Sequence, residues 1–244
     1  MDFSWPMLAG GALLAILVGM AKTGVPGLGI FVVPVMAILF PVRLSVGALL
    51  PLLIAADVMA TLFYRRHAQW PVLVRMLPWT YAGMGIATLV LWRLGNQGLT
   101  SLLGLLVLGM VGLELIRRRS GWNQVPHAPW FTHATGLAVG FSTTLGNVAG
   151  PVMSVYLVAR QFTKEHFMGT QAWFFLIVNL SKVPVYGALG LITADTLRFN
   201  ALMLPFVLAG GLFGRWLLPR IPPPVFETLV LVLAALAALR LLVP

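Results

Sequence analysis

Apolar residues occur along this chain in long uninterrupted blocks. The blocks cover residues 44–64, 76–92, 99–116, 170–192, 199–218 and 225–242, and each approaches the roughly 20 apolar residues that a helix needs to cross a bilayer. Hydrophobic residues make up 59% of the 244 residues and charged residues only 9%, with a mean hydropathy of +0.95. A soluble domain does not have this composition. The pattern predicts an all-α, polytopic membrane protein with at least six spans.

Two further stretches, residues 7–41 and 131–160, are too long for one crossing and are interrupted by glycine and proline. The interruptions are the segments Gly24–Gly29 and Gly146–Pro151. A shift of 122 residues aligns equivalent positions in the two halves of the chain, namely Gly24 with Gly146, Gly47 with Gly169, Tyr64 with Tyr186 and Asp57 with Asn179. We therefore expect two repeats, residues 1–122 and 123–244, each with a broken-helix hairpin and three spanning helices. This gives six to eight spans in total.

The charged residues between the apolar blocks bear on how the broken segments run. The net charge of +10 would suggest a nucleic-acid partner in a soluble chain, but here the basic residues lie in short loops, so we expect none. If both broken segments crossed the bilayer, the loop Lys and Arg residues would divide 8 to 6 between its sides; if both returned as hairpins, they would divide 10 to 4. The smaller group would then be Arg43, Arg93, Arg198 and Arg240. The positive-inside rule favours the hairpins, while eight full spans stay the alternative.

Broken helices inside a membrane expose backbone groups that must face protein or water. Helices that restart near Gly29 and Pro151 would present unpaired N–H groups and the positive ends of helix dipoles, which attract anions. Short donors and glycines surround both breaks. The predicted anion-binding residues are Lys22, Thr23, Gly24, Gly27, Gly29, Ser142, Thr143, Thr144, Gly146, Asn147 and Gly150. The alternative is that the glycines only allow close helix packing.

Ionisable side chains within the spans are few, and such residues are costly in a membrane. Asp57 lies in the middle of one span, and Asn179 and Lys182 lie one turn apart at the equivalent place in the second half. We expect Asp57 to pair with Lys182, either as a structural ion pair or as part of ion coupling. The chain has no cysteine, no metal-ligand spacing of histidines, no Walker sequence and no catalytic motif. We therefore predict no enzyme activity, no metal and no cofactor.

Several strings in both halves carry a family resemblance. They are Gly24–Gly29 with Pro34 in the first half, and Gly146–Met153, Gly169–Phe175 and Asn179–Pro184 in the second. Over nearly its whole length the chain resembles the sulfite exporter (TauE/SafE) family of bacterial permeases. The resemblance implies a multi-pass protein of the bacterial inner membrane that exports sulfite, sulfonates such as sulfoacetate, or related anions.

The residues and the resemblance together suggest a secondary transporter with alternating access, which holds its anion at the broken helix ends. The alternatives are an anion channel and a membrane-embedded accessory subunit of sulfur metabolism. The expected partners are the small anion and the lipid bilayer. A coupling ion, either a proton or sodium, and a homo-oligomer are also compatible with the sequence.

The 10 to 4 division of charges predicts that both chain ends lie on the non-cytoplasmic side, because three full crossings per half is an odd number. Reporter domains fused to each end should therefore be active only where the reporter works outside the cytoplasm. A cytoplasmic signal from either fusion would contradict this topology.

Overall fold

The computed structural model describes residues 4–24, 28–120, 129–160 and 162–217, together with residues 232, 235, 236, 238, 239 and 242. All regular structure in these residues is helical. The helices are α1 (Trp5–Thr23), α2 (Leu28–Leu39), α3 (Val42–Tyr64), the 3-10 turn η1 (Arg65–His67), α4 (Trp70–Arg93), α5 (Asn96–Ser120), α6 (Pro129–Gly146), α7 (Gly150–Ala159), α8 (Lys164–Ala188) and α9 (Ala194–Leu217). The predicted all-α class is confirmed.

Local sequence explains where several helices begin and end. Proline occupies the first turn of α1, α4 and α7, where its missing N–H costs no hydrogen bond. Thr163 caps α8 by accepting a hydrogen bond from the backbone N–H of His166 at 3.4 Å. Asn147 ends α6 and Gly190 follows α8, both with positive φ, 58° and 66°. Both broken segments therefore end at residues suited to a sharp change of direction.

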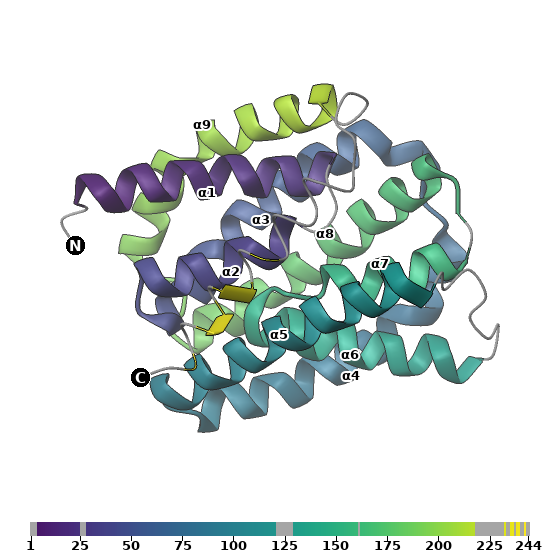
Figure 1. Ribbon diagram of the computed structural model, residues 1–244, viewed down its shortest axis with the longest axis horizontal. Helices are drawn as coiled ribbons and strands as arrows, with labels where there is room; N and C mark the ends of the chain where they lie inside the picture. Colours follow the sequence, from purple (N-terminus) through teal and green to yellow (C-terminus); the bar gives the residue numbers. More distant parts are fainter. Residues whose placement is uncertain are drawn as a thin grey trace.

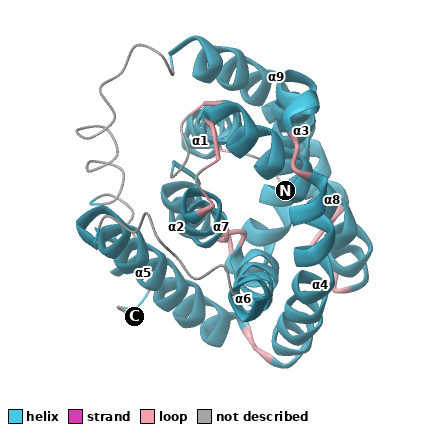
Figure 2. Cartoon of the chain, turned by 90° about the vertical axis from the view of Figure 1, so that its right-hand side faces the viewer, coloured by secondary structure: helices cyan, strands magenta, loops and turns pink. Residues whose placement is uncertain are grey.

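The two broken segments form antiparallel helix hairpins. Leu39, at the end of α2, lies against Gly10 near the start of α1, whereas Leu28 packs with Met20 at the tip. In the second half, the hydroxyl of Tyr156 in α7 is 3.1 Å from that of Thr132, near the start of α6. Figure 2 shows the short returning helices α2 and α7 near the middle of the bundle, with longer helices around them. The contacts confirm the hairpins that the charge distribution predicts.

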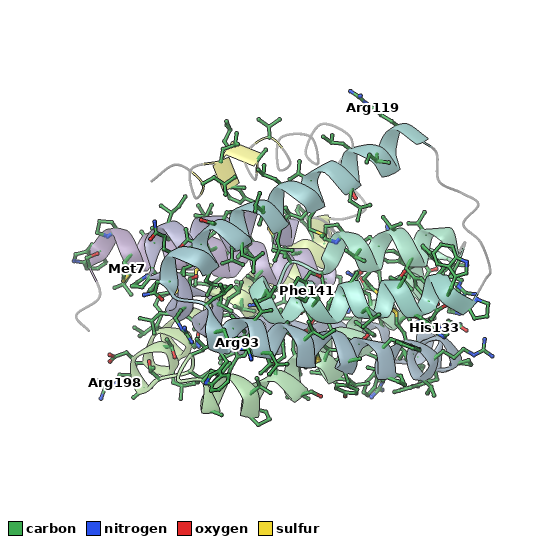
Figure 3. All side chains as sticks on the ribbon, turned by 90° about the horizontal axis from the view of Figure 1, so that it is seen from below. Met7, Arg93, Arg119, His133, Phe141 and Arg198 are labelled. Atoms are coloured by element: carbon green, nitrogen blue, oxygen red, sulfur yellow. The ribbon has the colours of Figure 1, made fainter. Side chains whose placement is uncertain are left out.

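The two halves run in opposite directions along the long axis of the molecule (Figure 1). At one end, Arg43 donates to the backbone oxygen of Leu94 at 3.0 Å; at the other, Trp173 donates to that of Arg65 at 3.3 Å. The Arg215 guanidinium lies 4.4 Å from the centre of the Phe63 ring, near the Arg65 end. Figure 3 places Met7 and Arg198 toward one end and Arg119 and His133 toward the other. The basic residues thus gather as expected for hairpins.

The outer surface is suited to lipid. Four described helices are long and apolar enough to span a bilayer, α1, α5 and α9 within their bounds and α3 extended to His67, and α4 and α8 have 24 and 25 residues. Large apolar side chains such as Leu62, Val74 and Leu89 are exposed along the helices. Exposed tryptophans occur near helix ends, where they suit the membrane–water interface: Trp5, Trp70, Trp92, Trp130 and Trp216. The chain is a polytopic membrane protein.

Each hairpin packs by its first helix against a helix of the other half. Helix α1 lies against α9, and α6 against α4, with glycines at both contacts. A Cβ on Gly83 of α4 would overlap the backbone oxygen of Leu137 in α6, and one on Gly140 of α6 would overlap that of Thr80 in α4. Small residues allow this close approach, which gives dispersion contact in a solvent that offers no hydrophobic drive.

We predict that Gly83→Ala destabilises the protein in detergent by about 1 to 3 kcal/mol, because backbone atoms of α6 must move aside. Gly85→Ala on the same helix is the matched control, since an added Cβ there meets nothing within 4 Å. It should be neutral or stabilise by up to about 1 kcal/mol through helix propensity. Thermal unfolding of both variants measures the difference, and equal melting temperatures would show that the two helices are not in close contact.

Candidate functional site

A cavity of about 50 Å³ lies between the tips of the two hairpins. A water molecule needs roughly 10 to 15 Å³ by this measure, so the space suits a few waters or one small anion. Backbone at the starts of α2 and α7 borders the cavity at Gly29 and Gly150, where an added Cβ would meet nothing within 4 Å. The polar side chains that line it are Lys22, Thr143, Asn147, Gln171 and Asn179.

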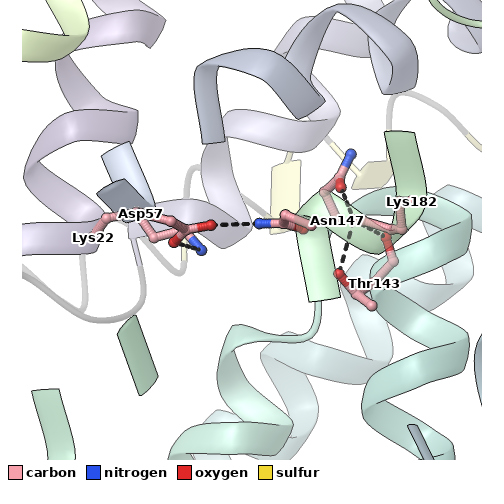
Figure 4. Close-up of polar contacts among 6 residues, drawn as sticks. Lys22, Asp57, Thr143, Asn147 and Lys182 are labelled. Carbon is pink, nitrogen blue, oxygen red and sulfur yellow. Dashed lines mark hydrogen bonds and ion pairs between the residues drawn. The ribbon is translucent and has the colours of Figure 1, made fainter. Parts of the chain in front are cut away.

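A buried carboxylate links three helices beside this cavity. Asp57 of α3 is fully buried, and its Oδ1 is 2.8 Å from the ammonium of Lys22 in the last turn of α1. Its Oδ2 accepts a 2.6 Å hydrogen bond from the side-chain amide of Asn179 in α8. Asp57 and Asn179 are the two residues that the 122-residue shift sets against each other, and they touch (Figure 4). The carboxylate therefore has a counter-ion and a donor, as its burial requires.

The expected ion pair between Asp57 and Lys182 is wrong. Asp57 pairs with Lys22, and the fully buried Lys182 ammonium donates to the backbone oxygen of Thr143 at 3.0 Å, its hydroxyl at 3.1 Å and the side-chain oxygen of Asn147 at 2.6 Å. Lys182 lies a turn beyond Asn179, beside the carbonyl end of α6, where the helix dipole is negative. All three ammonium protons are used there (Figure 4).

Several predicted anion ligands have other contacts. The Thr23 hydroxyl donates to backbone oxygens of Gly19 and Gly211, and that of Ser142 to Ala138. Such hydroxyls bond back to the preceding helical turn when no stronger acceptor is near. Thr144 is buried and, like Thr23 and Ser142, is not among the residues lining the cavity. Gly24 packs on the backbone of Gly214 and Gly146 on Leu103, and Gly27 lies outside the described residues.

The structure adds two residues that the sequence reasoning missed. Gln171 and Phe175 of α8 line the cavity, and the Lys22 ammonium lies 4.1 Å from the centre of the Phe175 ring. Gln171, Phe175 and Asn179 are spaced four residues apart and so occupy one face of α8. This periodicity was available in the sequence, because Asn179 was already a candidate on that helix.

The arrangement favours an anion. Among the described residues that line the cavity, Lys22 carries the only charge. The first N–H groups of α2 lack partners within that helix, and its positive end opens on the same space. Charge-assisted hydrogen bonds from such donors are the strong kind in a low-dielectric site. The cavity can therefore hold one small oxyanion against Lys22 and the hairpin tips.

We predict that Lys22 and Asp57 are energetically coupled. Removing either partner of a buried pair typically costs about 3 to 5 kcal/mol, because the remaining charge is stranded. Lys22→Met and Asp57→Asn should each destabilise the protein more than their combination does. A double-mutant cycle by thermal unfolding in detergent measures this, with Lys182→Met and Asp57→Asn as the comparison pair. A coupling energy no larger for Lys22 than for Lys182 would contradict the pairing.

Comparison with known proteins gives one family and no individual relative. The family model described as sulfite exporter TauE/SafE matches residues 11–241, nearly the whole chain. Neither the curated proteins nor the solved structures give a significant match. The matched range includes both hairpins and every residue of the cavity. The chain belongs to the TauE/SafE family of membrane transporters.

Proposed function

We propose that this protein is a secondary transporter of the bacterial inner membrane that exports a small sulfur oxyanion or sulfonate. The observation that carries the proposal is the position of Lys22, whose ammonium borders a cavity of about 50 Å³ between the two hairpin tips. A sulfite or sulfonate group has three oxygens on one face. It can accept from Lys22, from the N–H groups at the start of α2 and from the side-chain amide of Gln171.

The halves of the chain support alternating access. Helices α2 and α7 begin at Leu28 and Gly150, and α3 and α8 begin at Val42 and Lys164; both pairs are 122 residues apart, like Asp57 and Asn179. We infer that residues 1–122 and 123–244 are inverted repeats. In transporters of this kind the substrate lies at the repeat interface, and one group of helices rocks against the other to open each side in turn.

Equivalent glycines fit this division. An added Cβ at Gly47 of α3 would overlap the backbone oxygen of Leu191, in the turn after α8. The equivalent glycine of α8, Gly169, would bring a Cβ to 2.7 Å from the backbone oxygen of Tyr64, where α3 ends. Each central helix thus packs closely against the turn that follows its counterpart in the other half, which keeps α3 and α8 together as a shared axis.

Thermal stabilisation of the purified protein by an anion panel tests the substrate class. The panel is sulfite, sulfate, thiosulfate, methanesulfonate and sulfoacetate. A specific ligand at about 100 times its dissociation constant stabilises the folded state by about 2.7 kcal/mol, so a binder should raise the melting temperature clearly above the value in chloride. No shift with any member would contradict the proposal. In vesicles, saturable flux with counterflow distinguishes a transporter from a channel.

We predict that Lys22→Gln weakens anion binding about tenfold to a hundredfold, because one charge-assisted hydrogen bond is lost. Lys164→Gln is the matched control, since Lys164 is an exposed residue at the start of α8 and does not line the cavity. It should leave the affinity unchanged. Isothermal titration with the tightest panel member measures both, and an unchanged affinity in Lys22→Gln would assign Lys22 a structural role only.

A further inference from the structure

The Lys22 ammonium faces two competing partners. Its contact with Asp57 Oδ1 at 2.8 Å holds it toward α3, while the same side chain borders the cavity and is 16% exposed. One ammonium at this depth neutralises one negative charge well, because a second would be left without a counter-ion in a low-dielectric site. An anion in the cavity therefore competes with the Asp57 carboxylate for Lys22.

The other charged groups do not replace Lys22 at Asp57. Lys182 of α8 acts on the carboxylate electrostatically, but its three protons are held by the tip of the second hairpin. Helix α2, which also packs on α3, has no ionisable side chain in its range. The charged residues of α5 and α9, which also contact α3, lie in the terminal turns of those helices: Glu114, Arg117, Arg118, Arg119, Asp195, Arg198 and Arg215.

Resting on the proposed function, we infer that binding of one anion by Lys22 is coupled to the uptake of one proton by Asp57, so that anion and proton move together. In the empty site, Lys22 and Asp57 form a neutral pair. When Lys22 turns to a monovalent anion, that contact becomes the neutral pair, and a proton on Asp57 removes the charge that Lys22 no longer offsets. The net charge of the site is then the same in both states.

The atoms of the carboxylate allow this exchange. Oδ2 continues to accept from the amide of Asn179, so the proton occupies Oδ1, the oxygen that Lys22 leaves. The side-chain oxygen of Asn179 is buried, lacks a hydrogen-bond partner and belongs to a residue lining the cavity. It is an acceptor for an O–H donor arriving beside Asp57. The proton comes from water that enters with the anion, and no covalent bond other than this O–H forms.

Calorimetric titration of the full chain in detergent tests the coupling. The probes are methanesulfonate and sulfoacetate, whose acid groups stay ionised near neutral pH and carry no proton themselves. Titrations in two buffers with different ionisation enthalpies give the number of protons taken up on binding. We expect close to one proton per anion for the unaltered protein. Because the bound state holds the extra proton, affinity should rise as pH falls, by up to about tenfold per pH unit.

Variants assign the proton to its site. Asp57→Asn should bind either probe without proton uptake and with an affinity that does not change with pH. Glu165→Gln removes an exposed carboxylate at the start of α8 and should behave like the unaltered protein. If Asp57→Asn does not fold, the unaltered protein still decides the question.

The outcomes separate the two proposals. Binding heats that are identical in both buffers, with affinity independent of pH, would overturn proton coupling and leave the anion site intact. Proton uptake that persists in folded Asp57→Asn would overturn the assignment to Asp57. If neither probe binds, the proposed anion site fails and the coupling fails with it.

Discussion

The arrangement at the centre of this protein depends on keeping one carboxylate stable at membrane depth. Asp57 is completely buried, and a bare carboxylate there would cost several kcal/mol. Its two oxygens are held by Lys22 from the first hairpin and Asn179 from the second half. These contacts place the end of α1 and the middle of α8 against α3. The cavity lies next to them because the hairpin tips end at this depth.

The two lysines of the site have different roles because their surroundings differ. Lys182 donates to three oxygens at the end of α6 and holds the second hairpin tip against α8. Lys22 has one carboxylate oxygen and the face of Phe175, and it borders the cavity. A side chain whose donors are all used is fixed, whereas one with unused donors can turn to a new acceptor. The inverted halves are therefore chemically unequal, with the adjustable cation in the first.

Sequence reasoning predicted the backbone more completely than the side-chain contacts. Loop charges and the Gly and Pro breaks predicted the hairpins, because membrane insertion depends on properties of whole segments. The partner of Asp57 could not be predicted in the same way. Lys22 and Lys182 are both plausible counter-ions in the sequence, and the choice depends on the rotation of α1 and α8 about their axes. That rotation is set by packing against α9 and α3, which one sequence does not reveal.

The hydroxyl residues illustrate the same limit. Thr23, Ser142 and Thr143 all lie near the breaks, yet only Thr143 lines the cavity. Thr23 and Ser142 satisfy nearby backbone oxygens instead, since adjacent residues on a helix point about 100° apart. Gln171 was a more accessible inference, because its spacing from Phe175 and Asn179 follows the helical period.

The exchange of helices between halves has a consequence for how the protein assembles during synthesis. Helix α6 finds its partner α4 already made, so that glycine contact can form as soon as α6 enters the membrane. Helix α1 emerges first, but its partner α9 comes much later, and the Thr23 hydroxyl reaches a backbone oxygen 188 residues further along, at Gly211. Until then the glycine face of α1 remains open to lipid or to other membrane proteins. The contact that closes the bundle around the first hairpin is thus among the last to form.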